Sequence, residues 1–270
     1  VGEDYGGGEL ELVQFAPHDG GRGRLSITQD GKNAYVTSWG AITQHFARST
    51  TTGKLTPKSK AGIYNGEFTA LSADDKHLYA GGVNGIQYYD IPIANDGSIA
   101  DTATPVPPGY VSSLDAVRVG GTIFLASNGS IRSIVNGVYS TANRFPGTYD
   151  FVQTLTRAGD YLYWTEYSRG DLTPDKVAKV GRGKLHCDGT VGAREAFTVG
   201  LSPTGVAACA TNKNHYLYVI HRAAHLPEFP GWIDVVDLSK CATDFSTCAV
   251  AKKITSSELS GLGDLAGVNM

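Results

Sequence analysis

The chain has 270 residues, of which 41% are hydrophobic and 18% charged, and a formal net charge of −3. Its 23 Lys and Arg against 26 Asp and Glu leave no basic excess, which argues against a protein that tracks nucleic-acid phosphates. No segment approaches the ~18 consecutive apolar residues of a membrane-spanning helix. Abundant Gly (34) and Tyr (14) favour an all-β protein. We therefore expect one all-β domain over residues 1–270, with neither nucleic acid nor membrane as partner.

An internal repeat is the strongest signal in the sequence. Each copy holds an apolar strand, a tight polar turn with Gly, Asp or Asn, and a second strand with an aromatic residue in register. The copies cover residues 25–40, 68–82, 114–127, 151–166 and 205–221. The aromatic residues are Tyr35, Tyr79, Phe124, Tyr163 and Tyr218, at spacings of 44, 45, 39 and 55. Such spacing with strands alone predicts the blades of a β-propeller.

The rest of each repeat completes a four-stranded blade. Third strands are expected at 42–48, 85–91, 130–135, 176–182 and 232–238. A Gly-containing turn, such as TTGKL (51–55), NDGSI (95–99) or CDGTV (187–191), then leads to a short outer strand. Residues 8–17 resemble a further outer strand and residues 263–270 an innermost strand. A blade shared between the two ends would close the ring, which predicts six blades. A five-bladed ring with trailing ends and a seven-bladed ring are the alternatives.

Several phrases of the chain resemble a known family. DGKNAYV (30–36), DDKHLYAGG (74–82), TGKL (52–55) and DGSI (96–99) are similar to the lactonase-type propellers, which include 6-phosphogluconolactonase-like proteins and the fungal carboxy-cis,cis-muconate cyclase branch. The resemblance implies a hydrolase or isomerase acting on a small lactone or carboxylated substrate. The cyclase branch uses a His and Arg residues at the starts of inner strands. The corresponding starts in this chain, 112–117 and 148–153, hold no His or Arg, so no catalytic residue is carried over from the resemblance.

The cysteines favour a secreted, disulfide-bonded protein. Cys241 and Cys248 flank a six-residue loop and could close it, which would leave Cys187 to pair with Cys209, one of three possible connectivities. No Cys-x-x-Cys motif is present to suggest a zinc site. We expect an extracellular location, because disulfides persist in oxidising compartments.

A candidate site is expected at one mouth of the central channel. Alternating turns place the starts of inner strands and the turns between second and third strands on the same face of the ring, where a small ligand would be enclosed. Possible acids and bases there are Glu67, Asp150, Glu166 and His221. Possible substrate-binding residues are Arg22, Arg24, Trp39, Tyr149 and Asp264, the arginines being suited to clamp a carboxylate.

Other functions fit the same fold. No cofactor or metal is expected, although a ring of Glu67, Asp115, Asp150 and Asp264 could hold Ca²⁺ in the channel. A propeller that binds a carbohydrate or another small ligand without chemistry is an alternative, in which Trp39, Tyr149 and Tyr167 would stack on a sugar. A scaffold for protein partners is another, since propellers host all three functions.

Overall fold

The computed structural model describes most of the repeated part of the chain. The described residues are 23–38, 42–61, 68–81, 88–100, 104–106, 113–127, 130–135, 138–140, 151–167, 178–186, 188, 190–200, 203–210, 215–221 and 231–255. They form five antiparallel sheets of four strands each, here called blades 1 to 5 in chain order. Within the described ranges no helix is long and apolar enough to cross a membrane.

Each blade contains four strands that are consecutive in the sequence and in the sheet. Blades 1 and 2 comprise β1 (Gly23–Ile27), β2 (Asn33–Ser38), β3 (Thr43–Arg48), β4 (Leu55–Ala61), β5 (Phe68–Leu71), β6 (His77–Gly81), β7 (Tyr88–Pro92) and β8 (Thr104–Val106). Blades 3 and 4 comprise β9 (Ser113–Val119), β10 (Thr122–Ser127), β11 (Ser130–Val135), β12 (Val138–Ser140), β13 (Phe151–Ala158), β14 (Tyr161–Tyr167), β15 (Lys179–Lys184) and β16 (Glu195–Thr198). Blade 5 comprises β17 (Pro203–Ala210), β18 (His215–His221), β19 (Trp232–Asp237) and β20 (Val250–Thr255), with two short 3-10 helices, η1 (Leu238–Cys241) and η2 (Phe245–Thr247), between its last strands.

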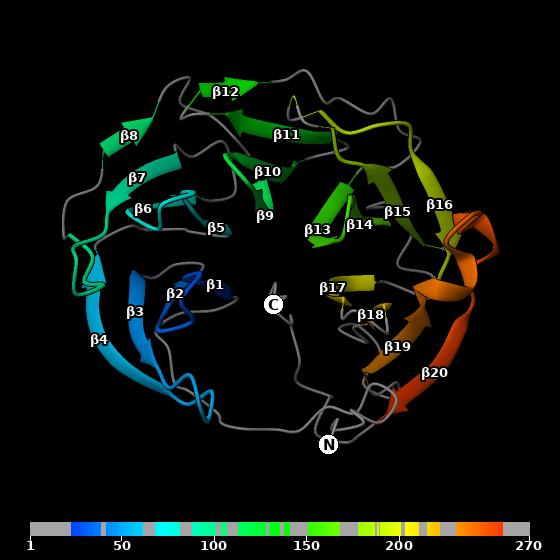
Figure 1. Cartoon of the computed structure of the whole chain (residues 1–270), viewed down its shortest axis with the longest axis horizontal. Helices are drawn as coiled ribbons and strands as arrows, with labels where there is room; N and C mark the ends of the chain where they lie inside the picture. The colour runs from blue at the N-terminus through cyan, green and yellow to red at the C-terminus, as the bar shows by residue number, and fades with distance from the viewer. Residues whose placement is uncertain are drawn as a thin grey trace.

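The blades radiate from a common axis, so the predicted all-β propeller is confirmed (Figure 1). The inner strands β1, β5, β9, β13 and β17 lie nearest the axis, and each packs against the next. The prediction of six blades is wrong for the described chain, which forms five. The extra blade was to come from residues 8–17 and 263–270, which lie outside the described residues. Repetition within a blade is local and visible in sequence, whereas ring closure depends on distant segments meeting.

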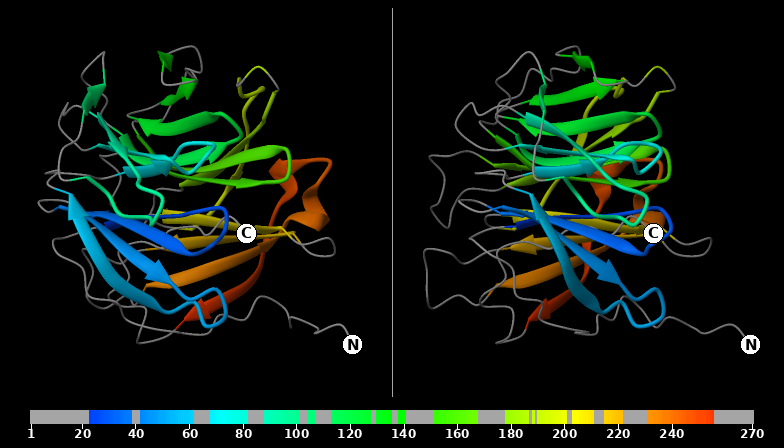
Figure 2. Two further views of the ribbon diagram at one scale, coloured as in Figure 1. Left: turned by 60° about the vertical axis from the view of Figure 1, so that its left-hand side comes forward. Right: turned by 90° about the vertical axis from the view of Figure 1, so that its left-hand side faces the viewer.

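The propeller has two different faces, which Figure 2 shows in side view. Because neighbouring strands are antiparallel, the starts of first and third strands and the ends of second and fourth strands share one face, called here the start face. The tight turns between first and second strands lie on the opposite face, called here the turn face. This is the arrangement predicted from the alternation of strands and turns.

The turn face is held together by side chains that bond within their own turns. In the first blade, Thr28 Oγ1 donates to Asp30 Oδ1 at 2.7 Å and Lys32 N donates to the same oxygen at 3.0 Å. These bonds lower the pKa of Asp30. Gly31, at φ 68°, supplies the left-handed residue that such a turn requires. Asp74 makes the equivalent bonds with Ser72 and Lys76. The sequence repeat therefore encodes the turn chemistry directly.

Apolar clusters between neighbouring blades form the core. Tyr35 and Leu78 belong to a buried cluster between blades 1 and 2, and Phe124 and Trp164 belong to one between blades 3 and 4. Tyr35, Phe124 and Tyr163, three of the aromatic residues predicted to be in register, are buried. Packing between blades therefore explains why each repeat carries a large ring at the same place.

Blade 5 is fastened to blade 4 by a disulfide-closed loop. The expected bond between Cys241 and Cys248 is present and closes the segment that contains η1 and η2. Phe245 of this segment packs edge-on against Phe197, and Arg182 of blade 4 donates to Ala242 O at 3.2 Å. The other expected pairing involves Cys187, which lies outside the described residues.

A buried histidine fastens blade 1 to blade 2. His45 is 2% exposed and stacks on Tyr35, with ring centroids 5.1 Å apart. Its Nε2 lies 2.9 Å from Asn33 Oδ1 and its Nδ1 lies 3.2 Å from Ser59 Oγ, which also accepts a hydrogen bond from Ile99 N of blade 2. Asn33 Oδ1 only accepts, so Nε2 carries the proton and Ser59 donates to Nδ1. Burial lowers the pKa of His45, which keeps the ring neutral.

We predict that His45 makes stability fall as the solution becomes mildly acidic. The folded-state pKa lies below the unfolded value of about 6.5, so the unfolded chain binds the additional proton first and the free energy of unfolding decreases as pH drops through that range. The turn carboxylates titrate lower, below about pH 4. Urea unfolding at pH 7.5 and 5.5 should show a smaller pH effect for His45→Gln than for the wild type. An equal pH effect in both proteins would contradict this prediction.

Candidate functional site

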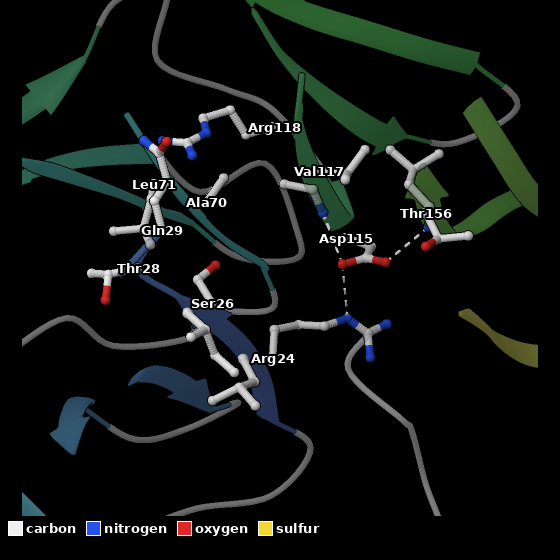
Figure 3. A pocket seen from close by; sticks show the side chains of 14 residues that line it. Arg24, Ser26, Thr28, Gln29, Ala70, Leu71, Asp115, Val117, Arg118 and Thr156 are labelled. Carbon is white, nitrogen blue, oxygen red and sulfur yellow. Dashed lines mark hydrogen bonds and ion pairs between the residues drawn. The ribbon is translucent and has the colours of Figure 1, made fainter. Parts of the chain in front are cut away.

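A cavity of about 180 Å³ lies among the inner strands of blades 1 to 4 (Figure 3). Its walls come from β1, β5, β9 and β13, together with the start of the turn that follows β1. The lining residues are Arg24 to Gln29, Ala70, Leu71, Asp115 to Arg118, Leu155 and Thr156. We call it the axial cavity, because these strands surround the axis of the propeller.

An ion pair stands at the start-face end of the axial cavity. Arg24 Nε lies 3.4 Å from Asp115 Oδ1, and the two side chains are 9% and 15% exposed. Asp115 also accepts hydrogen bonds from Ala116 N at 2.9 Å and from Leu155 N at 2.8 Å. Figure 3 shows Asp115 between Arg24 and the backbone of β13. The carboxylate therefore joins blades 1, 3 and 4 and fixes the guanidinium of Arg24 at the cavity wall.

A second arginine and aspartate meet at the turn-face end of the same cavity. Arg118 of β9 donates through Nη1 to Ser72 O and to Asp75 Oδ1, the latter at 3.1 Å. Asp75 Oδ2 accepts a hydrogen bond from Gln29 N at 2.7 Å. This network joins blades 1, 2 and 3. Sequence reasoning did not single out Arg118 or Asp75, because each belongs to the repeat pattern and they meet only once the blades stand side by side.

Glu166 lies at the end of β14 on the start face, where it was expected, and it is closely paired there. Its Oε1 accepts from Trp164 Nε1 at 2.6 Å and from Arg194 Nε at 2.6 Å, and its Oε2 accepts from Arg194 Nη2 at 2.5 Å. The side chain is 4% exposed. Both oxygens are occupied, which suits a structural ion pair better than a base that must collect a proton from substrate.

His221 lies at the end of β18, also on the start face, and is fully buried. Its Nε2 is 3.0 Å from Asp234 Oδ2, and its ring stacks on Trp232 with centroids 4.5 Å apart. Lys253 Nζ lies 4.5 Å from the centroid of the Trp232 ring. The described contacts thus place His221, Glu166 and Arg24 in three separate networks, of which only that of Arg24 lines the axial cavity.

The remaining predicted site residues lie outside the described residues. They are Arg22, Trp39, Glu67, Tyr149, Asp150 and Asp264, and Tyr167 belongs to β14 without a described side chain. Of the four carboxylates considered for Ca²⁺, only Asp115 is described. In the described ranges, no group of three or more His, Cys, Asp or Glu side chains is placed to hold a metal ion.

Buried polar atoms without partners gather on the start face. Among the described residues, seven such atoms have no hydrogen-bond partner: Thr37 Oγ1, Thr43 Oγ1, Gln44 Oε1, Thr69 Oγ1, Tyr88 Oη, Trp232 Nε1 and Asp234 Oδ1. Each residue lies within three places of a strand end on that face. Burial raises the pKa of Tyr88 to about 12, so its hydroxyl stays protonated. Buried polar groups without a protein partner are commonly bonded to ordered water.

Comparison with known proteins supports the fold and leaves the activity to be tested. No protein-family model matches the chain, and no curated protein matches it. Two solved structures titled "putative 6-phosphogluconolactonase" are similar. The one from Bacteroides uniformis has a TM-score of 0.57 at 16% identity, covering 86% of this chain and 71% of that one. The one from Bacteroides fragilis has a TM-score of 0.54 at 14% identity, covering 88% and 85%.

The same architecture also occurs in a protein with a different name. Hydrazine synthase from Kuenenia stuttgartiensis has a TM-score of 0.52 at 13% identity, covering 79% of this chain. This chain spans 62% of the length of that structure. These likenesses show a lactonase-like propeller fold. Likeness to a muconate cyclase is not among them and remains a prediction from sequence.

We predict that Gly181 is required for the Glu166 ion pair. A Cβ at Gly181 would lie 2.4 Å from the Trp164 ring and 2.8 Å from Glu166 Oε1. Gly181→Ala should therefore lower the free energy of unfolding by about 2–3 kcal/mol. Gly159→Ala is the matched control, since nothing lies within 4 Å of its added Cβ and only its φ of +56° opposes the change, which costs about 1 kcal/mol. Urea unfolding measures both losses, and equal losses would refute the prediction.

Proposed function

We propose that this protein is a lactonase-type enzyme that binds a small lactone or carboxylated substrate in the axial cavity. The observation that carries the proposal is the Arg24 guanidinium held by Asp115 at the wall of a small polar cavity. The names of the two similar Bacteroides proteins support a lactone as the substrate class. Oxidation of Cys241 and Cys248 supports the proposed secretion of the protein.

Arg24 is the proposed anion-binding residue. A guanidinium has five N–H donors in a planar fork, so it can hold Asp115 and a substrate carboxylate or phosphate together. Asp115 is the positioning residue, because its bonds to Arg24 and Leu155 N set the direction of the fork. Arg24 is 8% exposed, and hydrogen bonds to an anion are stronger in such a poorly hydrated place.

The proposed reaction is hydrolysis of the lactone ring. Water attacks the carbonyl carbon, the bond from that carbon to the ring oxygen breaks, and a proton from the water reaches the ring oxygen to give a hydroxy acid. Glu67 and Asp150, which lie outside the described residues, remain the proposed bases. A cycloisomerase step is a different reaction, in which a substrate carboxylate oxygen adds to one carbon of a carbon–carbon double bond and a proton from a general acid adds to the other; Arg24 would hold the substrate carboxylate in that case as well.

We predict that lactone turnover depends on Arg24. Arg24→Ala removes the anion-binding fork and should lower kcat/KM by at least about tenfold, mainly through KM, while Arg24→Lys keeps the charge and loses less. Release of acid from a panel of lactones, followed in a pH-stat, measures the effect. Arg157→Ala is the control, since that arginine is exposed on β13 and donates to Gly159 O.

Three outcomes discriminate between an enzyme, a non-catalytic binding protein and a protein-interaction scaffold. Turnover that survives Arg24→Ala unchanged would remove Arg24 and the axial cavity from the mechanism. Binding of lactones or sugars in calorimetry with no turnover at all would favour the non-catalytic binding propeller. Absence of both turnover and binding would leave the protein-interaction scaffold.

A further inference from the structure

We propose that Arg118 is a second anion-binding position, so that the axial cavity takes an elongated small molecule with an anionic group at each end. One anionic group would meet Arg24 near the start face and the other would meet Arg118 near the turn face. This inference rests on the proposed function for the role of Arg24 and extends it to the substrate class. It is carried by four observations on Arg118 and its surroundings.

Arg118 keeps donors available at the cavity wall. Its Nη1 is engaged by Ser72 O and Asp75 Oδ1, and the side chain is 19% exposed. For the part of the chain that the structure describes, its Nε and Nη2 have no hydrogen-bond partner. A guanidinium held by one nitrogen can present the remaining N–H groups to a carboxylate or phosphate. Figure 3 shows its side chain at the cavity end opposite Arg24.

The carboxylates that pair with the two arginines are already occupied by donors of the protein. Asp75 accepts from Arg118 and from Gln29 N, and Asp115 accepts from Arg24, Ala116 N and Leu155 N. The two aspartates therefore hold the arginines in place and offer little to a ligand that brings donors. A ligand that brings only acceptors fits better, which favours carboxylates and phosphates over amines.

The tight turn after β5 places the Asp75 carboxylate beside Arg118. Asp75, at φ 57°, takes the left-handed position that Gly31 holds in the turn of blade 1. Aspartate is one of the few non-glycine residues that adopt this conformation readily. Here the conformation lets one carboxylate reach both Gln29 N of blade 1 and Arg118 of blade 3.

The spacing of the two positions limits the ligand. Asp115, which holds Arg24, and Arg118 are three residues apart on β9, about 10 Å along the strand. A cavity of about 180 Å³ between them admits only a small molecule. The ligand should therefore be a short chain or ring with its two charges at opposite ends, of the size of a linear dicarboxylate.

The test compares linear dicarboxylates from malonate to suberate with monocarboxylates of the same lengths, using calorimetry on the intact protein. We expect a length optimum, with the best dicarboxylate binding at least about tenfold more tightly than its monocarboxylate. Arg118→Gln should remove that advantage and leave monocarboxylate affinity unchanged, and Arg118→Lys should keep part of it. Arg157→Gln should bind like the wild type.

The outcomes separate this inference from the proposed function. Equal affinities of the two acid series, or dicarboxylate binding that Arg118→Gln leaves intact, would overturn the second position even if lactones are hydrolysed. A length optimum without any lactone turnover would uphold the position and overturn the enzyme proposal. The Arg118→Gln protein must first give a wild-type near-ultraviolet circular dichroism spectrum. If it does not, the second anion-binding position is tested by the affinities of the wild type for dicarboxylates of increasing length and by the affinities of Arg118→Lys.

Discussion

The ion pair between Arg24 and Asp115 is the contact on which the axial cavity depends. Asp115 belongs to blade 3, yet it bonds to Arg24 of blade 1 and to Leu155 N of blade 4. One carboxylate thereby fixes three inner strands around the axis. Removing either charge would leave its partner in a place with little water, which is costly. The geometry of the site and the spacing of the blades are therefore coupled through this pair.

Stability alone does not account for charged residues at the axis. A partly buried ion pair contributes little net free energy, and apolar side chains of similar volume often stabilise a protein at least as well. The cores between blades, such as the cluster around Tyr35 and Leu78, already supply apolar burial. The placement of Arg24, Asp115 and Arg118 around one cavity supports the proposed ligand binding.

The sequence predicts the blades well and the site only in part, for one physical reason. Strands, tight turns and the registered aromatic residues are local features, so a repeat of some forty residues reveals them. Arg118 and Asp75 are 43 residues apart and meet only because blades 2 and 3 lie side by side, whereas Glu166 meets Arg194 across 28 residues within blade 4. Asp115 could be placed at a strand start, but its partner across the axis could not be read from spacing. The number of blades was mispredicted because the sixth blade was expected from residues 8–17 and 263–270, and the pairing of segments so far apart cannot be read from a local repeat.

The two faces of the propeller differ in how their polar groups are satisfied. On the turn face, Asp30, Asp74 and their neighbours satisfy one another within each turn. In strands that begin on the start face, the Tyr88 hydroxyl and Oδ1 of Asp234 are buried without a protein partner. Such groups lower stability unless water or a ligand bonds to them. A fold whose blades are joined by apolar cores can carry the cost of such groups.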